Sequence, residues 1–517
     1  MSAAYSLEPE VVTDPFITSR RIFDKLVGEA SSARALGTGH VEVEDAIRGT
    51  GRDLLRQLFQ DHLDLRSAQE RRVKVVDQEG EPLSEPRVAR RRLHSLLGGS
   101  VVVTRLLYQA SGREGRAPAD AGLRLCEDGY SMGVRRELAQ LCANDAYDPA
   151  VATLERLTGA HVPKRQAEEL VRRASKDVCA FYAQQVCEPV PQDALLILSF
   201  DAAGVVVLTK SLRPQTRKKA ENEPPDAQFP PKLKSGHKPN RKRMAQVGTV
   251  YAVLPFVRTA GDIVGELQSL TPTPQENPRP SRPRPINKRV FGSIAKSAAR
   301  VIDEGFREAL SRDPERKLRW VVLLDGNGDQ IRSVRRAAQR VGVEITIIAD
   351  LIHLIEYLWP AAYCFHPPGS DKAREWVVKR VRALLEGHDP AQVAAGMRRS
   401  ATLQKLEHRK AVNKCAQYML KLAPYMRYGD AIRDGLPIAT GVIEGACRHL
   451  IRRRLGIGGA RWSTAGAEAI LMLRATVMSD DFDAYWAFHE RQVFQRTHES
   501  KYRGPIPNTR RGLRLVK

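Results

Sequence analysis

The sequence predicts an α/β core with parallel strands, an all-helical insertion within that core, and an α+β region before it. Three observations carry this prediction. Strand-like apolar runs alternate with helical segments over residues 318–365, which is typical of a parallel sheet covered by helices. Residues 370–436 are polar and mostly helical in pattern, whereas residues 1–119 mix helical spacing with short β-branched runs.

The N-terminal region is predicted to span residues 1–119. Its first part has apolar residues at helical spacing, namely Leu54, Leu55, Leu58 and Phe59. Residues 73–109 switch to short β-branched runs that Gly and Pro separate, which favours a small β-meander.

Residues 120–190 are predicted to be a helical DNA-binding region. Asp148 is the expected N-cap of one helix and Gly159 its stop, and a second helix is expected to start at Pro163. Two helices joined by a short turn resemble a helix-turn-helix. The second begins with residues suited to phosphates and base edges, Lys164, Arg165 and Gln166. An ordinary helical hairpin with solvated charges is the alternative.

The first part of the core is predicted over residues 191–369. Two strand-like runs in 194–209 are interrupted at Asp201, and a long basic loop follows over 210–245. The Pro-rich segment 271–287 cannot form a helix interior.

Two further strands, WVVLL and VEITIIA, end at Asp325 and Asp350, and each precedes a helix. The helical insertion is predicted over residues 370–436 and the last part of the core over 437–496, with a helix from Thr440 to Gly456. Residues 497–517 form a basic tail that is expected to be disordered.

The composition points to nucleic acid as the first expected partner. The chain has 517 residues and a formal net charge of +23. An anionic membrane surface fits that charge less well, and solvated charged faces without a specific partner are the plain alternative. The sequence has no apolar run long enough to span a membrane and no secretory signal, so no membrane partner is expected. Its seven cysteines form no C-x-x-C pair, which favours a reduced, cytoplasmic protein.

Three acidic residues lie at the edges of apolar elements: Asp201, Asp325 and Glu444. An acid at the carboxyl end of a buried strand lies where α/β sheets bind ligands. Three carboxylates at one point repel each other, and Mg²⁺ or Mn²⁺ would neutralise them. Two such ions stabilise the attacking and leaving oxygens in phosphoryl transfer.

Asp201 interrupts an apolar run, which a plain core strand would avoid, but the other acids have plainer structural interpretations. Asp325 belongs to an Asp-Gly-Asn-Gly sequence that is typical of a strand-ending turn. Glu444 is four residues before Arg448, so the two are candidates for an intrahelical ion pair. Asp350 is a candidate N-cap of the next helix, with His353 as a packed histidine, and we expect both to support the site.

The chain resembles a known family at this point. The runs LLDGNGDQ, IADLIHLIEYLW, PIATGVIEGACRHLIRRRLGIGGARWSTAGAEAILMLRA and DFDAYWAFHE are similar to those of the Kra-type insertion-sequence transposases. These are bacterial DDE enzymes similar to the Mutator superfamily. The resemblance covers roughly residues 120–495 and is strongest over 320–490.

The resemblance implies an RNase H-like catalytic core with an all-helical insertion before the last acid. It assigns Asp201, Asp325 and Glu444 as catalytic residues and as ligands of two Mg²⁺ or Mn²⁺ ions. Asp350 and His353 match a signature that follows the second acid, although Asp350 also competes with Asp325 as second ligand. Ala202 stands where relatives often have Gly after the first acid, and Asp193 is a poor substitute for Asp201 because it precedes the strand.

The implied activity is metal-dependent cleavage at the ends of a mobile element and strand transfer into target DNA. A homo-oligomer on DNA and a nucleoid-associated location in a bacterial cytoplasm are expected. Arg448 is expected to support the acids. Phosphate contacts are expected from the basic loop and the later arginines, namely Arg217, Lys218, Lys219, Arg241, Lys242, Arg243, Arg452, Arg453 and Arg454.

Arg461 and Trp462 are candidates for a wedge or stacking contact with DNA, with a buried Trp as the commoner alternative. Two other functions stay open. One is a catalytically inactive DNA-binding relic of a transposase, and the other is a metal-dependent nuclease of the same fold that does not join strands.

Overall fold

The computed structural model describes residues 14–84, 86–222, 241–268, 281–457 and 459–510. The chain divides into two compact units. The first combines residues 1–183 with 481–517, and the second spans residues 184–480. The segment that starts at residue 481 therefore belongs to the same unit as the N-terminal region. The sequence instead predicted that the last part of the core extends to residue 496.

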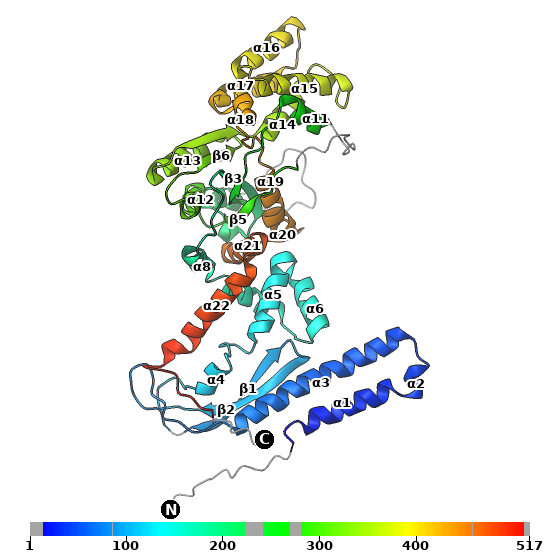
Figure 1. Ribbon diagram of the computed structural model, residues 1–517, viewed down its shortest axis with the longest axis vertical. Helices are drawn as coiled ribbons and strands as arrows, with labels where there is room; N and C mark the ends of the chain where they lie inside the picture. Colours follow the sequence, from blue (N-terminus) through cyan, green and yellow to red (C-terminus); the bar gives the residue numbers. More distant parts are fainter. Residues whose placement is uncertain (1–13, 85, 223–240, 269–280, 458, 511–517) are drawn as a thin grey trace, which may run out of the picture. The chain divides into compact units, whose positions relative to one another are not determined.

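The first unit begins with a helical hairpin and a two-stranded sheet (Figure 1). The strands pair antiparallel from Arg87↔Leu107 to Ser95↔Gly99, so the predicted meander is a single hairpin. Leu63 packs with Leu93 and Val101 in a small core between helix and sheet. The elements are α1 (Ile17–Ala30), α2 (Ala33–Leu36), α3 (His40–Ala68), β1 (Arg87–Ser95) and β2 (Gly99–Leu107).

Short helices complete this unit: α4 (Pro118–Gly122), α5 (Met132–Asn144), α6 (Tyr147–Thr158), α7 (Lys164–Ala174), α8 (Val178–Gln184) and α22 (Phe482–Thr497). Helix α6 starts after Ala146, so Asp148 lies in its first turn and is not the N-cap. Gly159 ends α6 in the left-handed conformation, with φ 73°, as the sequence predicts. Helices α5, α6 and α7 pack on one another, which is compatible with a helix-turn-helix.

A buried carboxylate joins the two ends of this unit. Asp177 accepts hydrogen bonds from His489 Nδ1 at 2.7 Å and from both terminal nitrogens of Arg496. The segment after α22 is ordered as far as residue 510, and Tyr502 and Thr509 are buried. The predicted disordered tail is therefore wrong for residues 498–510, and residues 511–517 lie outside the described part.

The second unit is built on a five-stranded mixed sheet in the order β5-β4-β3-β6-β7. Strands β6 and β7 run parallel to β3, as predicted, whereas β4 and β5 are antiparallel. The difference arises because β3 and β4 form one long antiparallel pair, from Leu195↔Val253 to Val206↔Lys242. The strands are β3 (Leu195–Val206), β4 (Lys242–Val253), β5 (Ile286–Ser293), β6 (Arg319–Leu324) and β7 (Ile345–Ala349).

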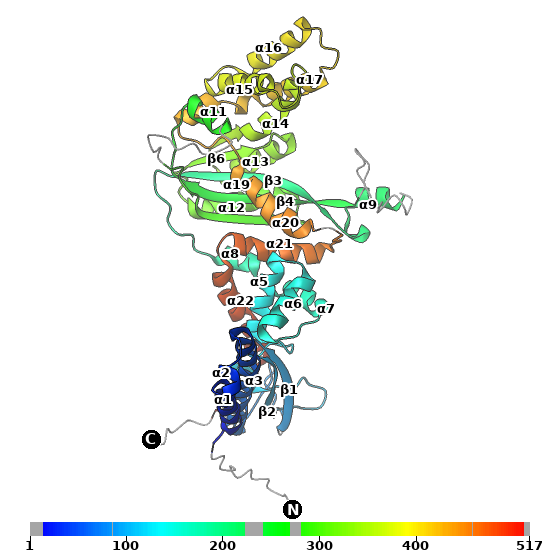
Figure 2. The ribbon, with the colours of Figure 1, turned by 90° about the vertical axis from the view of Figure 1, so that its right-hand side faces the viewer.

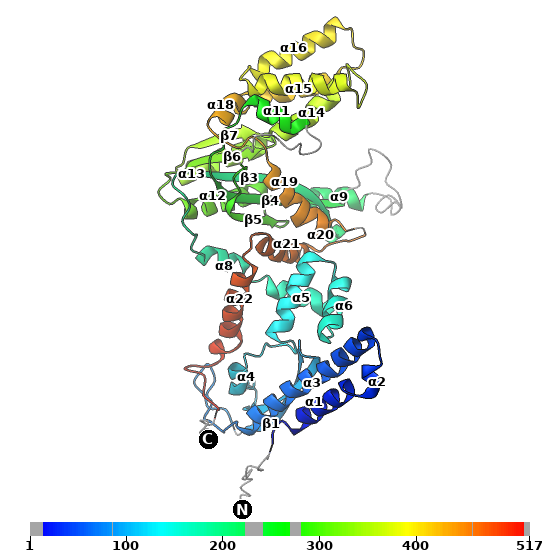
Figure 3. The same ribbon diagram turned by 45° about the vertical axis from the view of Figure 1, so that its right-hand side comes forward.

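Helices surround this sheet, and Figures 2 and 3 show α9 at the far end of the β3–β4 pair. Helix α9 lies within the predicted basic loop, of which residues 223–240 are outside the described part. The Pro-rich segment falls partly outside it too, over residues 269–280. The helices before the insertion are α9 (Pro214–Glu221), α11 (Ala260–Gln268), α12 (Ala298–Arg312), α13 (Gly328–Val341) and α14 (Leu351–Ala362).

The helical insertion shares one apolar core with the sheet. Trp376 and Met419 belong to the same cluster as Trp320 and Leu323 of β6. The insertion contains α15 (Asp371–Leu385), α16 (Pro390–Leu403), α17 (Lys410–Leu422) and α18 (Tyr428–Arg433). The chain then continues through α19 (Gly441–Ala446), a π-helical turn (Cys447–Arg452), α20 (Arg453–Leu455) and α21 (Thr464–Met478).

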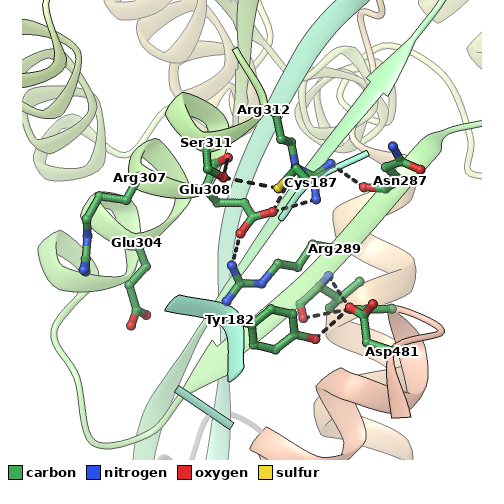
Figure 4. Close-up of polar contacts among 12 residues, drawn as sticks. Tyr182, Cys187, Asn287, Arg289, Glu304, Arg307, Glu308, Ser311, Arg312 and Asp481 are labelled. Atoms are coloured by element: carbon green, nitrogen blue, oxygen red, sulfur yellow. Dashed lines mark hydrogen bonds and ion pairs between the residues drawn. The ribbon is translucent and has the colours of Figure 1, made fainter. Parts of the chain in front are cut away.

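A buried ion cluster fastens α12 to the sheet (Figure 4). Glu308 of α12 is almost fully buried and pairs with Arg289 of β5 and with Arg312, whose Nε is 2.9 Å from Glu308 Oε1. Such a carboxylate requires its partners, because an unpaired buried charge is strongly destabilising. The cluster thus holds the edge strand β5 in place.

Candidate active site

The three predicted acids line one cleft of the second unit, with a volume of about 920 Å³. Asp201, Asp325 and Glu444 come from three separate elements. Asp350 and His353 line the same cleft. The cleft is also lined by Arg448, His449, Arg452 and Arg453, which follow Glu444 along the same helical segment. The structure therefore brings together residues that are more than 200 positions apart in the sequence.

Asp201 lies inside strand β3, not at its end. The parallel pairing of β3 with β6 stops at Ser199↔Leu323, whereas the antiparallel pairing with β4 continues through Asp201↔Val247. Asp201 is thus two residues beyond the parallel pairing. Its carboxylate accepts a hydrogen bond from the N–H of Ala202 at 2.6 Å.

Asp325 follows directly after β6 and begins a tight turn. Gly326 has φ +94°, and an added Cβ would lie 2.2 Å from Cδ1 of Leu422. The hydroxyl of Tyr418 donates to the carbonyl oxygen of Asp325 at 3.0 Å. Asn327 caps α13 through the N–H of Asp329. The strand-ending turn predicted from the sequence is present, and it also places Asp325 at the cleft.

Glu444 is exposed at the cleft on the short helix α19. Partial burial of its carboxyl raises its pKa, and the charges of Asp350, Glu356 and Asp201 raise it further. Arg448 is not among the charges that shift the pKa of Glu444 most strongly. An intrahelical ion pair with Arg448 is therefore not the main influence on this carboxyl. The helix changes to a π turn at Cys447, which alters the four-residue spacing of a regular helix.

Asp350 caps helix α14 and also holds the segment that leads to Glu444. Its carboxylate accepts a hydrogen bond from the N–H of Ile352 at 2.9 Å and another from the Thr440 hydroxyl. Burial raises the pKa of Asp350, and these hydrogen bonds oppose the rise. Both of its oxygens are thus engaged, which fits the supporting role expected for it.

His353 lies one turn further along α14. Its Nδ1 is 3.2 Å from Glu356 Oε2, and its ring contacts Tyr357 and Tyr418 edge-on. This arrangement agrees with the packed histidine that the sequence suggests.

Two further residues of the cleft were not predicted. Glu356 faces it and contributes to the raised pKa of Glu444. The three-residue spacing of Asp350, His353 and Glu356 on one helix was a signal that would have identified Glu356. Cys447 is buried beside Asp201, and burial and a hydrogen bond to Asp201 both raise the pKa of its thiol. A lone Cys in a helix gives no such signal in the sequence.

The carboxylates of the cleft are the oxygen ligands that divalent cations such as Mg²⁺ prefer, but their side chains are not close enough together to surround one ion. Across the described ranges, no three His, Cys, Asp or Glu side chains are grouped closely enough to hold one ion. Burial raises the pKa of Glu444, and repulsion from Asp350, Glu356 and Asp201 raises it further. A hard cation with oxygen ligands would relieve that repulsion.

The predicted phosphate-binding residues differ in their availability. Nine are exposed: Lys164, Arg165, Gln166, Arg217, Lys218, Lys219, Lys242, Arg452 and Arg453. Arg461 is exposed as well, and Arg241 is half-buried.

Three of the predicted contacts involve side chains that the structure engages or buries. The guanidinium of Arg243 donates to the carbonyl oxygens of Ile294 and Ser211, so it serves the fold. Arg454 is only 2% exposed and lies over the ring of Trp462. Trp462 is itself buried, and its indole N–H donates to the carbonyl oxygen of Leu455 at 3.2 Å. Neither Arg454 nor Trp462 can contact DNA in this structure.

No protein-family model matches the sequence, and no curated protein matches it. In the part of the chain that the structure describes, every helix is too short or too polar to cross a bilayer.

Proposed function

We propose that the chain is a DNA transposase that cuts the ends of a mobile element and joins them to target DNA. One observation carries the proposal: acids from β3, from the end of β6 and from α19 line a single cleft that is also lined by arginines of the helical segment following Glu444. Negative side chains suit metal ions, and the adjacent arginines suit a phosphodiester backbone. A cleft lined by acids alone, or by arginines alone, would support the proposal less than one lined by both.

We further propose that the core is RNase H-like. The order of the acids along the fold supports this. The first is on the first strand of the mixed sheet, and the second directly follows the neighbouring parallel strand. The third is on a helix that comes after the all-helical insertion. This is the arrangement that the resemblance to the Kra-type transposases implies.

In this proposal Asp201, Asp325 and Glu444 would hold two Mg²⁺ or Mn²⁺ ions. When bound, the ions supply Lewis-acid activation of water or of a 3′-hydroxyl and stabilise the leaving oxygen. Asp350 acts as a positioning residue, because it fixes Thr440 at the start of the helix that carries Glu444. Arg448, Arg452 and Arg453 would hold the phosphates beside the acids.

The expected partner is DNA, bound by a homo-oligomer in the nucleoid of a bacterial cytoplasm. The exposed residues of α9, Arg217, Lys218 and Lys219, would extend the contact with phosphates away from the cleft. Lys164, Arg165 and Gln166 at the start of α7 would read the element end.

The test uses purified protein, Mn²⁺ or Mg²⁺, and DNA from both flanks of the gene. The wild type should cut at defined ends and produce joined strands. Alanine variants at Asp201, Asp325 and Glu444 should lose both products, whereas Asp350→Ala should retain part of the activity. Asp329→Ala is the matched control, because Asp329 is a highly exposed acid on α13 outside the cleft.

The other outcomes separate the alternatives. Salt-sensitive DNA binding without metal-dependent cutting by the wild type would identify a DNA-binding relic. Cutting without joined products would identify a nuclease of the same fold. Cutting that survives in all three acid variants would show that the reaction uses another site.

A further inference from the structure

The hairpin formed by β1 and β2 has one buried face and one open face. Leu93, Val101 and Val103 pack with α3 in the small core of the first unit. Successive side chains of a strand point to opposite sides, so the alternate positions lie on the other face. There Val88 is 63% exposed and Val102 is 39% exposed. This open face is therefore available to a partner.

The open face of the hairpin carries positive charge. Arg90 and Arg92 lie on it at alternate positions of β1, and both side chains are exposed. Within the described ranges neither of them forms an ion pair, whereas Arg91, on the buried face, pairs with Asp120. Residues 86–113 contain six arginines and no Asp or Glu. The two strands therefore supply no acid that could neutralise this face.

The tip of the hairpin lies against the turn between α6 and α7. The N–H of Gly98 at the tip donates to the carbonyl oxygen of Thr158, the last residue of α6, at 3.1 Å. Burial lowers the pKa of His94, and the charges of Arg92 and His161 lower it further. His161 belongs to the turn between the two helices. The open face of the hairpin therefore continues towards the start of α7.

This position suits a contact with the same duplex that α7 is proposed to read. A helix in the major groove is flanked by phosphates, and arginines beside the groove fix the protein on the duplex. The helices of the same unit provide a contrast, because residues 14–68 contain eight Lys and Arg and nine Asp and Glu. Arginines on an open strand edge also hinder pairing with strands of other chains. The experiment must separate that role from DNA binding.

We propose that the open face of the β1–β2 hairpin binds phosphates of duplex DNA beside the turn between α6 and α7, through Arg90 and Arg92. These two arginines add affinity and position the chain on the duplex without reading its sequence. The inference rests on the proposed function in taking DNA as the partner. It requires no metal ion and none of the acids in the cleft, so the hairpin and the cleft can fail separately.

The first test measures how DNA binding by the full chain depends on salt, with a short duplex of arbitrary sequence and no divalent metal. Arg90→Ala and Arg92→Ala should each make the salt slope shallower by about 0.9, and the double variant by about twice as much. Arg90→Lys and Arg92→Lys should keep the wild-type slope, because the slope counts neutralised phosphates. Arg21→Ala is the matched control, since Arg21 is an exposed arginine on α1. All of these side chains are exposed, so the urea midpoint should stay unchanged.

The second test locates the DNA by photo-crosslinking. Val102 lies opposite Arg92 on the open face, so p-benzoylphenylalanine in its place should cross-link to the duplex on irradiation. The same group in place of Val27 on α1 is the control and should give a much lower yield. Val27 is 49% exposed, so lower accessibility would not explain that difference.

Alanine variants that keep the wild-type slope would overturn the proposal, even in a protein that binds and cuts DNA. If those variants also aggregate, the two arginines protect the strand edge instead. Equal cross-linking at positions 102 and 27 would overturn the proposal as well. Shallower slopes in a wild type that never cuts DNA would support the hairpin contact and contradict the transposase. A wild type that does not bind DNA would overturn both.

Discussion

Replacing Gly326 by alanine tests how the turn after β6 places Asp325. The backbone at φ +94° disfavours any residue with a Cβ, which costs about 1–2 kcal/mol. The added methyl would also lie 2.2 Å from Leu422 Cδ1, and Leu422 is only 1% exposed. Overpacking of a fixed core residue costs about 1–3 kcal/mol more. We expect Gly326→Ala to lower the free energy of unfolding by about 2–5 kcal/mol.

Gly342→Ala is the matched control. Gly342 ends α13 with φ +69°, but nothing lies within 4 Å of its added Cβ, so this variant should show only the backbone cost. Urea unfolding followed by tryptophan fluorescence measures both variants. The signal is dominated by the second unit, which holds four of the five tryptophans: Trp320, Trp359, Trp376 and Trp462.

The pair Gly326 and Leu422 also permits a double-mutant cycle. In a Leu422→Ala background the overlap is gone, so Gly326→Ala should cost no more than Gly342→Ala. The reasoning is refuted if Gly326→Ala is as mild as Gly342→Ala in the wild-type background. It is also refuted if Leu422→Ala leaves the cost of Gly326→Ala unchanged.

Four further predictions concern charged groups. Because the folded pKa of Glu444 is raised, its ionised form is disfavoured in the fold and this carboxyl costs stability as pH rises through that pKa. Mn²⁺ should therefore raise the urea midpoint more above the raised pKa of Glu444 than below it, and Glu444→Gln should remove that difference. Arg454→Ala should destabilise the protein by about 2–4 kcal/mol in urea unfolding, because its buried stem leaves a cavity beside Trp462. Arg452→Ala and Arg453→Ala should instead leave the urea midpoint unchanged and each reduce the salt slope of DNA binding by about one. Burial alone would raise the pKa of Asp177, but His489 and Arg496 outweigh it and hold the pKa at about 2. This carboxylate should contribute roughly 2 kcal/mol above pH 3.8, and the contribution should disappear as pH falls from there towards 2. Acid titration of stability in wild type and Asp177→Asn tests this, and parallel curves would contradict it.

The strands that end at acids were predictable because their sequences are continuously apolar. Trp320 to Leu324 and the end of β7 are buried on both faces, and such strands in a parallel sheet show no alternation. Asp325 and Asp350 follow as the first polar residues, so both positions were evident from the sequence. The end of helix α6 at Gly159, which adopts the left-handed conformation, could also be predicted from the local sequence.

The placement of Asp201 within a strand was not predictable in the same way. A polar residue after an apolar run usually indicates the end of a strand. Strand β3 nevertheless continues past Asp201, because β4 pairs with it along its whole length. That pairing joins segments on either side of the basic loop, and local pattern does not contain it. The predicted parallel strands are confirmed for β3, β6 and β7, whereas the antiparallel β4 and β5 were not predicted for the same reason.

Contacts between residues distant in the sequence also determine which polar side chains are exposed to solvent. Arg454 is one of three consecutive arginines, but it is buried and lies over the ring of Trp462, whereas Arg452 and Arg453 are exposed. Asp350 as an N-cap was a local prediction, whereas its hydrogen bond with Thr440, 90 residues later, was not. Sequence patterns thus indicated the candidate acids, and tertiary structure showed what supports them.

The central claim is that Asp201, Asp325 and Glu444 converge on the same metal ions, and iron-directed cleavage of the polypeptide tests it most directly. Fe²⁺ takes the place of Mg²⁺ or Mn²⁺, and ascorbate with peroxide then generates radicals that cut the chain beside the bound ion. The account predicts cuts near residues 201, 325 and 444 together, all suppressed by excess Mg²⁺ and by Asp201→Asn. Cuts near one of these residues alone, or at sites that Asp201→Asn does not affect, would contradict it.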